Sequence, residues 1–252
     1  MSHQDNLVGS VGTSFAIIEY LKENDDAGIT DISRGIGVTK STVFNHVRTL
    51  EDNDVLIRHG DQYRLSLKFL DYGEHVRRNV DLFRVGKSLI DDLSEGTGEV
   101  ANIMVPENGR GVYLYKSMGE KAVKHDTRAG KRICLHCTAL GKSILSQMSE
   151  SEVDAVIEQH GLAKMTESTI TSRDELFEEL EQIRERGYAI NTGERNERVR
   201  CVGAPIQAHG EVRGAISVSG PETRMKNDEF IEGIATQVQE TANVIEINLE
   251  HG

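Results

Sequence analysis

Three cysteines and one histidine are the residues of this sequence whose types and spacing most readily suggest chemistry. Cys134, His136 and Cys137 lie within four consecutive positions, and Cys201 follows later in the chain. Thiolates and imidazoles are preferred zinc ligands, so a metal site is one interpretation. A thiol sensor or thiol-based enzyme is another, because the arginines close to Cys201 could lower the pKa of its thiol. The cluster lacks a second pair of ligands, and no neighbouring sequence supplies a base with an orienting acid. We therefore expect no catalytic residue and no metal ion, and we keep thiol or metal sensing as the alternative function.

Charge distribution gives a second chemical signal. The 252-residue chain has 41 Asp and Glu against 29 Lys and Arg, a net charge of −12. Taken alone, this surplus argues against nucleic acid, whose phosphates are neutralised by cations. From Ile32 to Leu50, however, the chain carries Arg34, Lys40 and Arg48 and no acidic residue. This window is where the sequence favours DNA binding.

Composition restricts the class of protein further. Hydrophobic residues make up 37% of the chain and charged residues 28%, which predicts a packed, soluble protein. An odd number of cysteines cannot form a closed disulfide framework, so reduced thiols are expected. The apolar runs are shorter than a membrane span, and residues 1–6 lack the pattern of a secretory signal. We expect a cytoplasmic protein without a membrane partner.

The elements that must position the basic window are three helices and a hairpin. Apolar spacing and capping residues predict helices from Gly12 to Glu23, from the N-cap candidate Thr30 to Gly37, and from the cap Thr39 to Leu50. Segments 55–58 and 62–65 flank the turn His59-Gly60-Asp61 and predict a hairpin. Three helices followed by a hairpin are typical of a winged helix-turn-helix.

The third helix has a polar face that suits a major groove. Asn45 can pair bidentately with adenine, and Arg48 can contact guanine or phosphate. Backbone amides and hydroxyls at the helix start suit phosphates. A helical subdomain whose polar helix merely faces solvent is the alternative, and the hairpin and the acid-free window favour DNA. The predicted DNA-binding residues are Arg34, Thr39, Lys40, Ser41, Thr42, Asn45, Arg48, Arg58, His59 and Arg64.

The remainder of the chain predicts a connecting helix and an α+β domain. A helical pattern from Leu67 to Ser94 reads as a connecting segment with one long helix. Beyond it, strands and helices interleave without a regular βαβ rhythm. We predict a DNA-binding domain at 8–70, a linker helix at 71–95 and a sensor domain at 96–252. The predicted strands are Val100–Val105, Gly111–Lys116, Tyr188–Asn191, Cys201–Ala208 and Val212–Ser219, and the predicted helices are Thr138–Gln147, Ser151–His160, Arg173–Arg186 and Asn227–Leu249.

Motifs along nearly the whole chain resemble the IclR-type transcription regulators. In the first domain they are residues 29–32, 37–43, 50–56 and 63–65, and in the second they are residues 135–142, 186–188, 201–206 and 216–221. The resemblance implies a homodimer or dimer of dimers on double-stranded operator DNA. It also implies a GAF-like α/β effector-binding domain for small, often carboxylate-bearing, metabolites. The predicted function is thus a sequence-specific DNA-binding transcription regulator, not an enzyme, controlled by an organic acid and without a cofactor.

The same resemblance places the effector pocket on the turn and helix start at 136–142, on the segment 191–194, and on Cys201. A helix start offers free N–H groups and a positive dipole end to an anion. The structural alternative is that Cys201 is a small buried hydrophobe and Ala139 is ordinary core. The predicted effector-binding residues are Ala139, Leu140, Asn191, Glu194, Cys201, Ser217 and Ser219.

Two departures from the family pattern bear on the charge of the effector. Asn191 stands where many relatives have Asp, and Arg198 stands where Gly commonly occurs. His125 and Arg128, in a polar segment, could balance an acidic ligand or simply face solvent. The effector of this chain can therefore differ in charge preference from those of its relatives.

Overall fold

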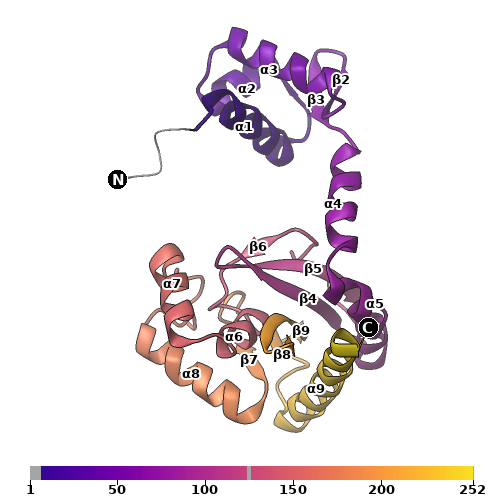
Figure 1. Cartoon of the computed structure of the whole chain (residues 1–252), viewed down its shortest axis with the longest axis vertical. Coiled ribbons are helices and arrows are strands. Elements are labelled where there is room, and N and C mark those ends of the chain that lie inside the picture. The colour runs from indigo at the N-terminus through magenta and orange to yellow at the C-terminus, as the bar shows by residue number, and fades with distance from the viewer. Residues whose placement is uncertain (1–6, 124–125, 252) are drawn as a thin grey trace. The chain divides into compact units, whose positions relative to one another are not determined.

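The computed structural model describes residues 7–123 and 126–251. The chain forms two compact units that divide between Val76 and Arg77. Each unit has a hydrophobic core of its own. Figure 1 shows the helices and strands of both units. Within the described residues, every helix is too short or too polar to cross a lipid bilayer.

The N-terminal unit is the predicted winged helix-turn-helix. Its three-stranded sheet has the order β1-β3-β2 with antiparallel neighbours. Ile17, Ile32, Val43 and Tyr63 are buried together, so each helix and the wing contribute to one core. The elements are α1 (Gly9–Asn24), β1 (Ala27–Gly28), α2 (Ile29–Ile36), α3 (Lys40–Asp52), β2 (Leu56–His59) and β3 (Gln62–Leu65).

The start of α2 differs from the prediction that Thr30 caps it. The helix begins at Ile29, and the N-cap position is Gly28, which has no side chain to accept a hydrogen bond. Gly28 also pairs with Gln62 in the sheet, so the chain passes directly from a strand into the helix. The short strand β1 accounts for this difference, and its two residues are too few to give a recognisable pattern.

The wing turn is tighter than predicted. His59 pairs with Gln62 in the hairpin, so only Gly60 and Asp61 form the turn. Gly60 has a φ of 62°, a left-handed conformation that favours glycine. His59 is therefore a strand residue at the wing tip.

The connecting segment contains two helices, where one was predicted over 71–95. Helix α4 (Lys68–Arg78) buries none of its residues, whereas α5 (Asp81–Thr97) buries a full apolar face. Between them, Val80 has an extended backbone and packs against the core of the second unit. The change from an exposed helix to a packed one coincides with this break.

The second unit is built on a six-stranded antiparallel sheet, and the predicted mixed α+β class is confirmed. The strand order is β6-β5-β4-β9-β8-β7. Helices α5 and α9 pack on one face of the sheet, and α6, α7 and α8 contribute to the core on the other face (Figure 1). The elements after α5 are β4 (Val100–Glu107), β5 (Arg110–Met118), β6 (Arg132–Ile133), α6 (Ala139–Ser146), α7 (Glu150–His160), α8 (Arg173–Arg186), β7 (Ala189–Thr192), β8 (Val199–Ala208), β9 (Glu211–Pro221) and α9 (Asp228–His251).

Candidate effector pocket and DNA-reading surface

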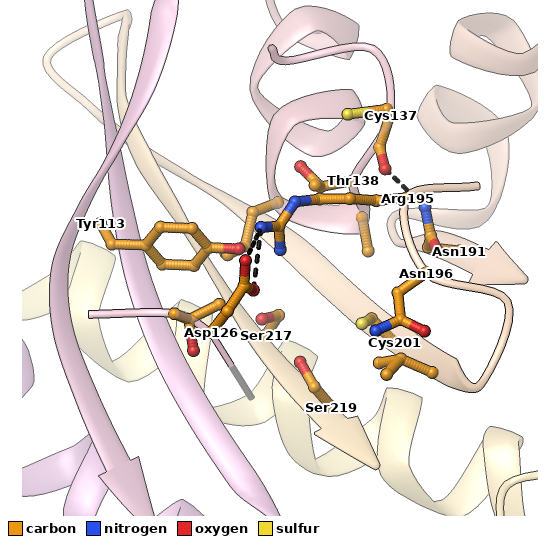
Figure 2. A pocket seen from close by; sticks show the side chains of 14 residues that line it. Tyr113, Asp126, Cys137, Thr138, Asn191, Arg195, Asn196, Cys201, Ser217 and Ser219 are labelled. Atoms are coloured by element: carbon orange, nitrogen blue, oxygen red, sulfur yellow. Dashed lines mark hydrogen bonds and ion pairs between the residues drawn. The ribbon is translucent and has the colours of Figure 1, made fainter. Parts of the chain in front are cut away.

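A pocket of about 520 Å³, including its open mouth, lies on the α6 side of the large sheet. Of the predicted effector-binding residues, all but Glu194 line it. Figure 2 shows side chains from strands, from the start of α6 and from two connections around this space. The lining residues are Tyr113, Asp126, Thr127, Cys137, Thr138, Ala139, Leu140, Asn191, Arg195, Asn196, Val199, Cys201, Ser217 and Ser219.

The floor of the pocket follows from strand alternation. Ser219 lies opposite Cys201 in the register of β9 and β8, and Ser217 lies opposite Gly203. Successive side chains of a strand point to opposite faces. The residues between and beside these serines, Ile216 and Val218, are accordingly buried in the core on the other face of the sheet.

The start of α6 is held in place by a tight turn. The Thr138 side chain caps the helix by accepting a hydrogen bond from the Gly141 amide at 3.0 Å. A Cβ atom at Gly141 would lie 2.0 Å from the Leu135 carbonyl oxygen, so only glycine fits there. Ala139 and Leu140, which line the pocket, contribute first-turn amides that have no acceptor within the helix. This end of α6 is therefore a place where an anion is favoured.

An ion pair that sequence reasoning missed lies in the pocket. Arg195, from the connection between β7 and β8, places its Nη2 atom 2.9 Å from both carboxylate oxygens of Asp126. Figure 2 shows the Arg195 side chain extended across the pocket toward Tyr113. Burial raises the pKa of Tyr113, so its hydroxyl stays protonated and remains a donor. Both charged residues lie in irregular connections, where no periodicity signals that they face a cavity.

Two hydroxyl groups of the pocket have no partner. The Ser217 Oγ and Thr127 Oγ1 atoms are buried and form no hydrogen bond within the described residues. An unpaired buried hydroxyl costs free energy unless a partner is supplied. These atoms are therefore available to a ligand.

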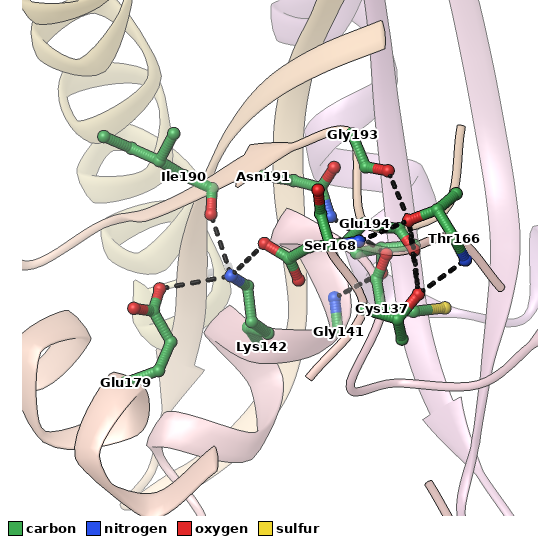
Figure 3. Close-up of polar contacts among 12 residues, drawn as sticks. Cys137, Gly141, Lys142, Thr166, Ser168, Glu179, Ile190, Asn191, Gly193 and Glu194 are labelled. Carbon is green, nitrogen blue, oxygen red and sulfur yellow. Dashed lines mark hydrogen bonds and ion pairs between the residues drawn. The ribbon is translucent and has the colours of Figure 1, made fainter. Parts of the chain in front are cut away.

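Glu194 has a different place from the predicted one. Its carboxylate accepts a hydrogen bond at 2.7 Å from the buried Lys142 Nζ, which also contacts Glu179 Oε1 at 3.1 Å and the Ile190 carbonyl at 2.9 Å (Figure 3). Burial raises the pKa of the Glu194 carboxyl, and the neighbouring ammonium of Lys142 opposes this shift. Glu194 thus anchors the segment that carries Arg195.

The three cysteines and the histidine considered for a metal site lie in different environments. Cys134 Sγ accepts a hydrogen bond from Arg110 at 2.6 Å, and His136 Nε2 lies 3.1 Å from the Ala163 carbonyl. Cys137 and Cys201 line the pocket described above. In the part of the chain that the structure describes, no three His, Cys, Asp or Glu residues are grouped to hold a metal ion.

The two cysteines that line the pocket are not activated thiols. Burial raises the pKa of Cys137 to about 12 and that of Cys201 to about 11. The expected lowering by neighbouring arginines is therefore wrong for Cys201, because desolvation outweighs it. Arg128 is exposed and does not line the pocket, and His125 lies outside the described residues.

The predicted DNA-reading face of α3 is accessible. Thr39 caps the helix by accepting a hydrogen bond from the Thr42 amide at 3.2 Å. Thr42 is half-buried, whereas the outward residues Ser41, Asn45 and Arg48 are exposed. Phe44, which sequence reasoning missed, is 48% exposed beside Asn45 although it is a large apolar side chain. Lys40 is exposed at the start of the same helix.

The wing adds cationic side chains to the N-terminal unit. Arg58, His59 and Arg64 are exposed, and Arg58 is held by its Nε atom, which donates to the Gly60 carbonyl at 2.9 Å. Arg34 on α2 is exposed and lies 3.9 Å from Asp31. Among the described residues, Lys40, Arg48 and Arg64 form no ion pair, so their charges face solvent.

A winged helix-turn-helix followed by a pocket-bearing α+β domain is an architecture found in transcription regulators. Residues 10–59 match the IclR helix-turn-helix domain, and residues 74–247 match the C-terminal domain of bacterial IclR regulators. This chain belongs to the IclR family of transcriptional regulators, and it carries the DNA-binding and effector-binding domains of that family.

Individual proteins agree with this assignment. The chain is 34% identical over 248 residues to a probable HTH-type transcriptional regulator, ArcR of Halobacterium salinarum, covering 96% of this chain and 94% of that protein. The crystal structure of Thermotoga maritima IclR matches with a TM-score of 0.82 and 29% identity over 96% of this chain and 98% of that one. An IclR homolog from Microbacterium hydrocarbonoxydans, complexed with 4-hydroxybenzoate, matches in fold with a TM-score of 0.82 at 20% identity, covering 95% and 98%.

Proposed function

We propose that this protein is a sequence-specific DNA-binding transcription regulator whose second unit binds a small carboxylate metabolite in the pocket described above. The observation that carries the proposal is the convergence of three kinds of anion partner on one cavity. These are the Arg195 guanidinium, the unpartnered Ser217 hydroxyl and the first-turn amides of α6. Each favours a carboxylate oxygen, and guanidinium–carboxylate pairs are among the stronger hydrogen bonds.

The remaining lining indicates a ligand with an apolar body. Leu140, Val199 and the ring of Tyr113 supply apolar surface beside the polar groups. Small-molecule sites commonly combine an apolar lining with a few placed polar groups. The Microbacterium protein with the same fold was crystallised with an aromatic carboxylate, which supports a small organic acid as the class to test.

On the DNA side, the exposed face of α3 is the proposed reading surface. Asn45 and Arg48 would contact base edges, while Lys40 and the wing residues Arg58, His59 and Arg64 would contact the phosphate backbone. Thr39, Ser41 and Thr42 would contact phosphates at the start of the helix, and Arg34 of α2 would contact another phosphate.

One reading helix per chain requires a partner, because regulators of this kind read two half-sites with two-fold symmetry. Val8, Val11 and Phe15 are exposed at helical spacing at the start of α1. Such a stripe is costly in water. We propose that a second copy of the chain covers it in a homodimer, from which a dimer of dimers can form. Light scattering should give a dimer or tetramer, and a strict monomer with and without DNA contradicts this part.

The DNA proposal is tested with an operator fragment obtained by mapping bound sites across the source genome. In fluorescence-anisotropy titrations, Asn45→Ala should lose operator discrimination worth about 1–3 kcal/mol. Lys40→Ala should weaken binding to all DNA sequences alike. It should also reduce the slope of log binding constant against log salt concentration by about one unit. Lys164→Ala, an exposed lysine of the second unit paired with Glu167, is the control and should match wild type. Wild-type discrimination in the Asn45 variant would place the reading surface elsewhere.

A further inference from the structure

We propose that Asp126 is a resident competitor for the carboxylate of the effector. Asp126 holds the Nη2 atom of Arg195, and an effector carboxylate would compete with it for the charge of the guanidinium. Asp126 would therefore set how tightly anionic effectors bind and how strongly the pocket prefers them. The inference rests on the proposed function, in that it assumes a carboxylate ligand in the same pocket.

The geometry of the pair supports this role. Both Asp126 oxygens lie 2.9 Å from the Nη2 atom of Arg195, so the Asp126 carboxylate occupies a donor position that a ligand carboxylate could use. Asp126 comes from the connection between β5 and β6, and Arg195 comes from the connection between β7 and β8. The two side chains meet within the pocket rather than outside it (Figure 2).

Arg195 and Asp126 are unequally buried, and this difference determines which of the two can be replaced by a ligand group. The Arg195 side chain is 19% exposed, whereas that of Asp126 is 64% exposed. Returning a mostly hydrated carboxylate to water costs little, while leaving a mostly buried guanidinium without a partner costs more. Arg195 is accordingly the fixed member of the pair, and the carboxylate is the exchangeable one.

Asp126 also keeps a cation when it gives up Arg195. Lys131 Nζ bonds to the Asp126 carboxylate and, at 3.0 Å, to the Asp126 backbone carbonyl. Displacement therefore does not leave an isolated charge. This second partner lowers the free-energy cost of exchange.

An effector carboxylate has contacts available that Asp126 does not make. Within the described part of the chain, the Ser217 and Thr127 hydroxyls line the same pocket without a hydrogen-bond partner. The first-turn amides of α6 have no acceptor within the helix. A ligand that takes Arg195 together with one of these donors gains bonds that the resident carboxylate leaves unused. A ligand with a neutral amide gains no such advantage over Asp126, because it cannot replace a charge on the guanidinium.

The test compares full-length wild type with Asp126→Asn, Arg195→Gln and the control Asp154→Asn. Asp154 forms a similar pair with Arg173, at 2.6 and 2.8 Å, away from the pocket. The probes are acetate, butyrate, benzoate and 4-hydroxybenzoate, each measured beside its own amide by calorimetry at constant pH. Cooperative melting of each variant establishes that it is folded.

Asp126→Asn should bind the best carboxylate about tenfold more tightly than wild type, the size expected for one charge-assisted hydrogen bond. Its affinity for the matching amide should not change, and Asp154→Asn should bind both like wild type. Arg195→Gln should lose the preference for the acid over the amide.

Two other results separate the possible failures. Equal or weaker carboxylate binding by Asp126→Asn, with carboxylates still bound by wild type, overturns the competitor role and leaves the proposed function standing. Binding of amides alone, or of no probe by either wild type or Asp126→Asn, overturns the carboxylate pocket itself and the competitor role with it.

Discussion

Lys142 Nζ lies 2.7 Å from Glu194 Oε1, and neither side chain is more than 9% exposed. The two residues come from α6 and from the connection after β7, so the pair joins the helix that lines the effector pocket to the segment that carries Arg195. A buried ion pair is costly to break from one side, because the remaining charge stays desolvated. This pair therefore holds α6 and the segment that carries Arg195 together, and both contribute residues to the pocket lining.

Removing the ammonium should destabilise the second unit strongly. Lys142→Met leaves the buried Glu194 carboxylate without its cation, whereas the half-buried Glu179 keeps Arg186 at 3.0 Å, and we expect a loss of about 3–5 kcal/mol in the free energy of unfolding. Lys164→Met, in an exposed pair with Glu167, should change it by less than about 0.5 kcal/mol. Urea unfolding measures both. Adding Glu194→Gln to Lys142→Met should recover part of the loss, and equal stability of the two lysine variants contradicts the anchoring role.

Stability of the second unit should fall in mild acid through His136. Burial lowers the pKa of His136 below its ordinary value of 6.5, so the folded state holds the neutral ring that contacts the Ala163 carbonyl. A lowered histidine pKa contributes stability that is fully present above pH 6.5 and is lost as pH falls through the folded pKa. Calorimetric melting of His136→Gln should depend less on pH in this range. His160→Gln is the control, since the half-buried His160 forms a solvent-exposed hydrogen bond with the Asn108 carbonyl.

Filling the pocket should block the ligand without unfolding the protein. Ala139→Leu adds bulk at a lining position beside the helix start, where overpacking costs about 1–3 kcal/mol. We expect cooperative melting and no detectable carboxylate binding by calorimetry. Ala155→Leu, at an exposed site on α7, should bind like wild type. Retained affinity in the Ala139 variant would place the effector elsewhere.

Asn191→Asp tests an amide that the structure uses as a donor. Asn191 Nδ2 donates to the Cys137 carbonyl at 2.9 Å, and an ionised aspartate would face that carbonyl without a proton to donate. We expect a loss of about 1–3 kcal/mol at neutral pH and weaker binding of anions. The melting temperatures of variant and wild type should approach each other as pH falls, because a protonated aspartate can donate again. A pH-independent difference would show that this hydrogen bond is not the cause.

Phe44 should recognise a thymine methyl group in the operator. It is a large exposed apolar residue beside Asn45 on the reading helix, and contact with this methyl is a common apolar means of base recognition. Replacing the contacted thymine with uracil should weaken operator binding by the wild type about fourfold, which corresponds to the free energy of burying one methyl group. Phe44→Ala should bind the thymine and uracil operators alike. An unchanged preference for thymine in this variant assigns the contact to another side chain.

Sequence patterns were sufficient to predict an element that has a regular apolar period and a capping residue. The stripe Val43 and Val47 with the cap Thr39 predicted α3 correctly, and alternation placed Ser217 and Ser219 on one face. The family resemblance brought Ala139, Leu140, Asn191 and Cys201 to the pocket lining, although their contact with an effector stays a prediction.

The sequence predictions differ from the structure where tertiary contacts determine the position of a residue. Glu194 and Arg195 are adjacent charged residues, yet one turns to a buried lysine and the other enters the pocket. Local sequence contains nothing that distinguishes them. The break at Val80 likewise depends on packing against the second core, because the helical pattern itself continues across it.

Strand β9 contributes side chains to the pocket on one face of the sheet and to a hydrophobic core on the other face. Ser217 and Ser219 face the effector pocket, while Ile216 and Val218 belong to the core that also contains Leu82, Phe83 and Ile90 of α5. At Gly214 the strand backbone lies so close to Leu82 that an added Cβ would meet it at 2.7 Å. Helix α5 is the helix that follows the linker from the DNA-binding unit along the chain. Strand β9 is therefore shared between the floor of the pocket and the packing surface of α5, with no second layer of side chains between the two.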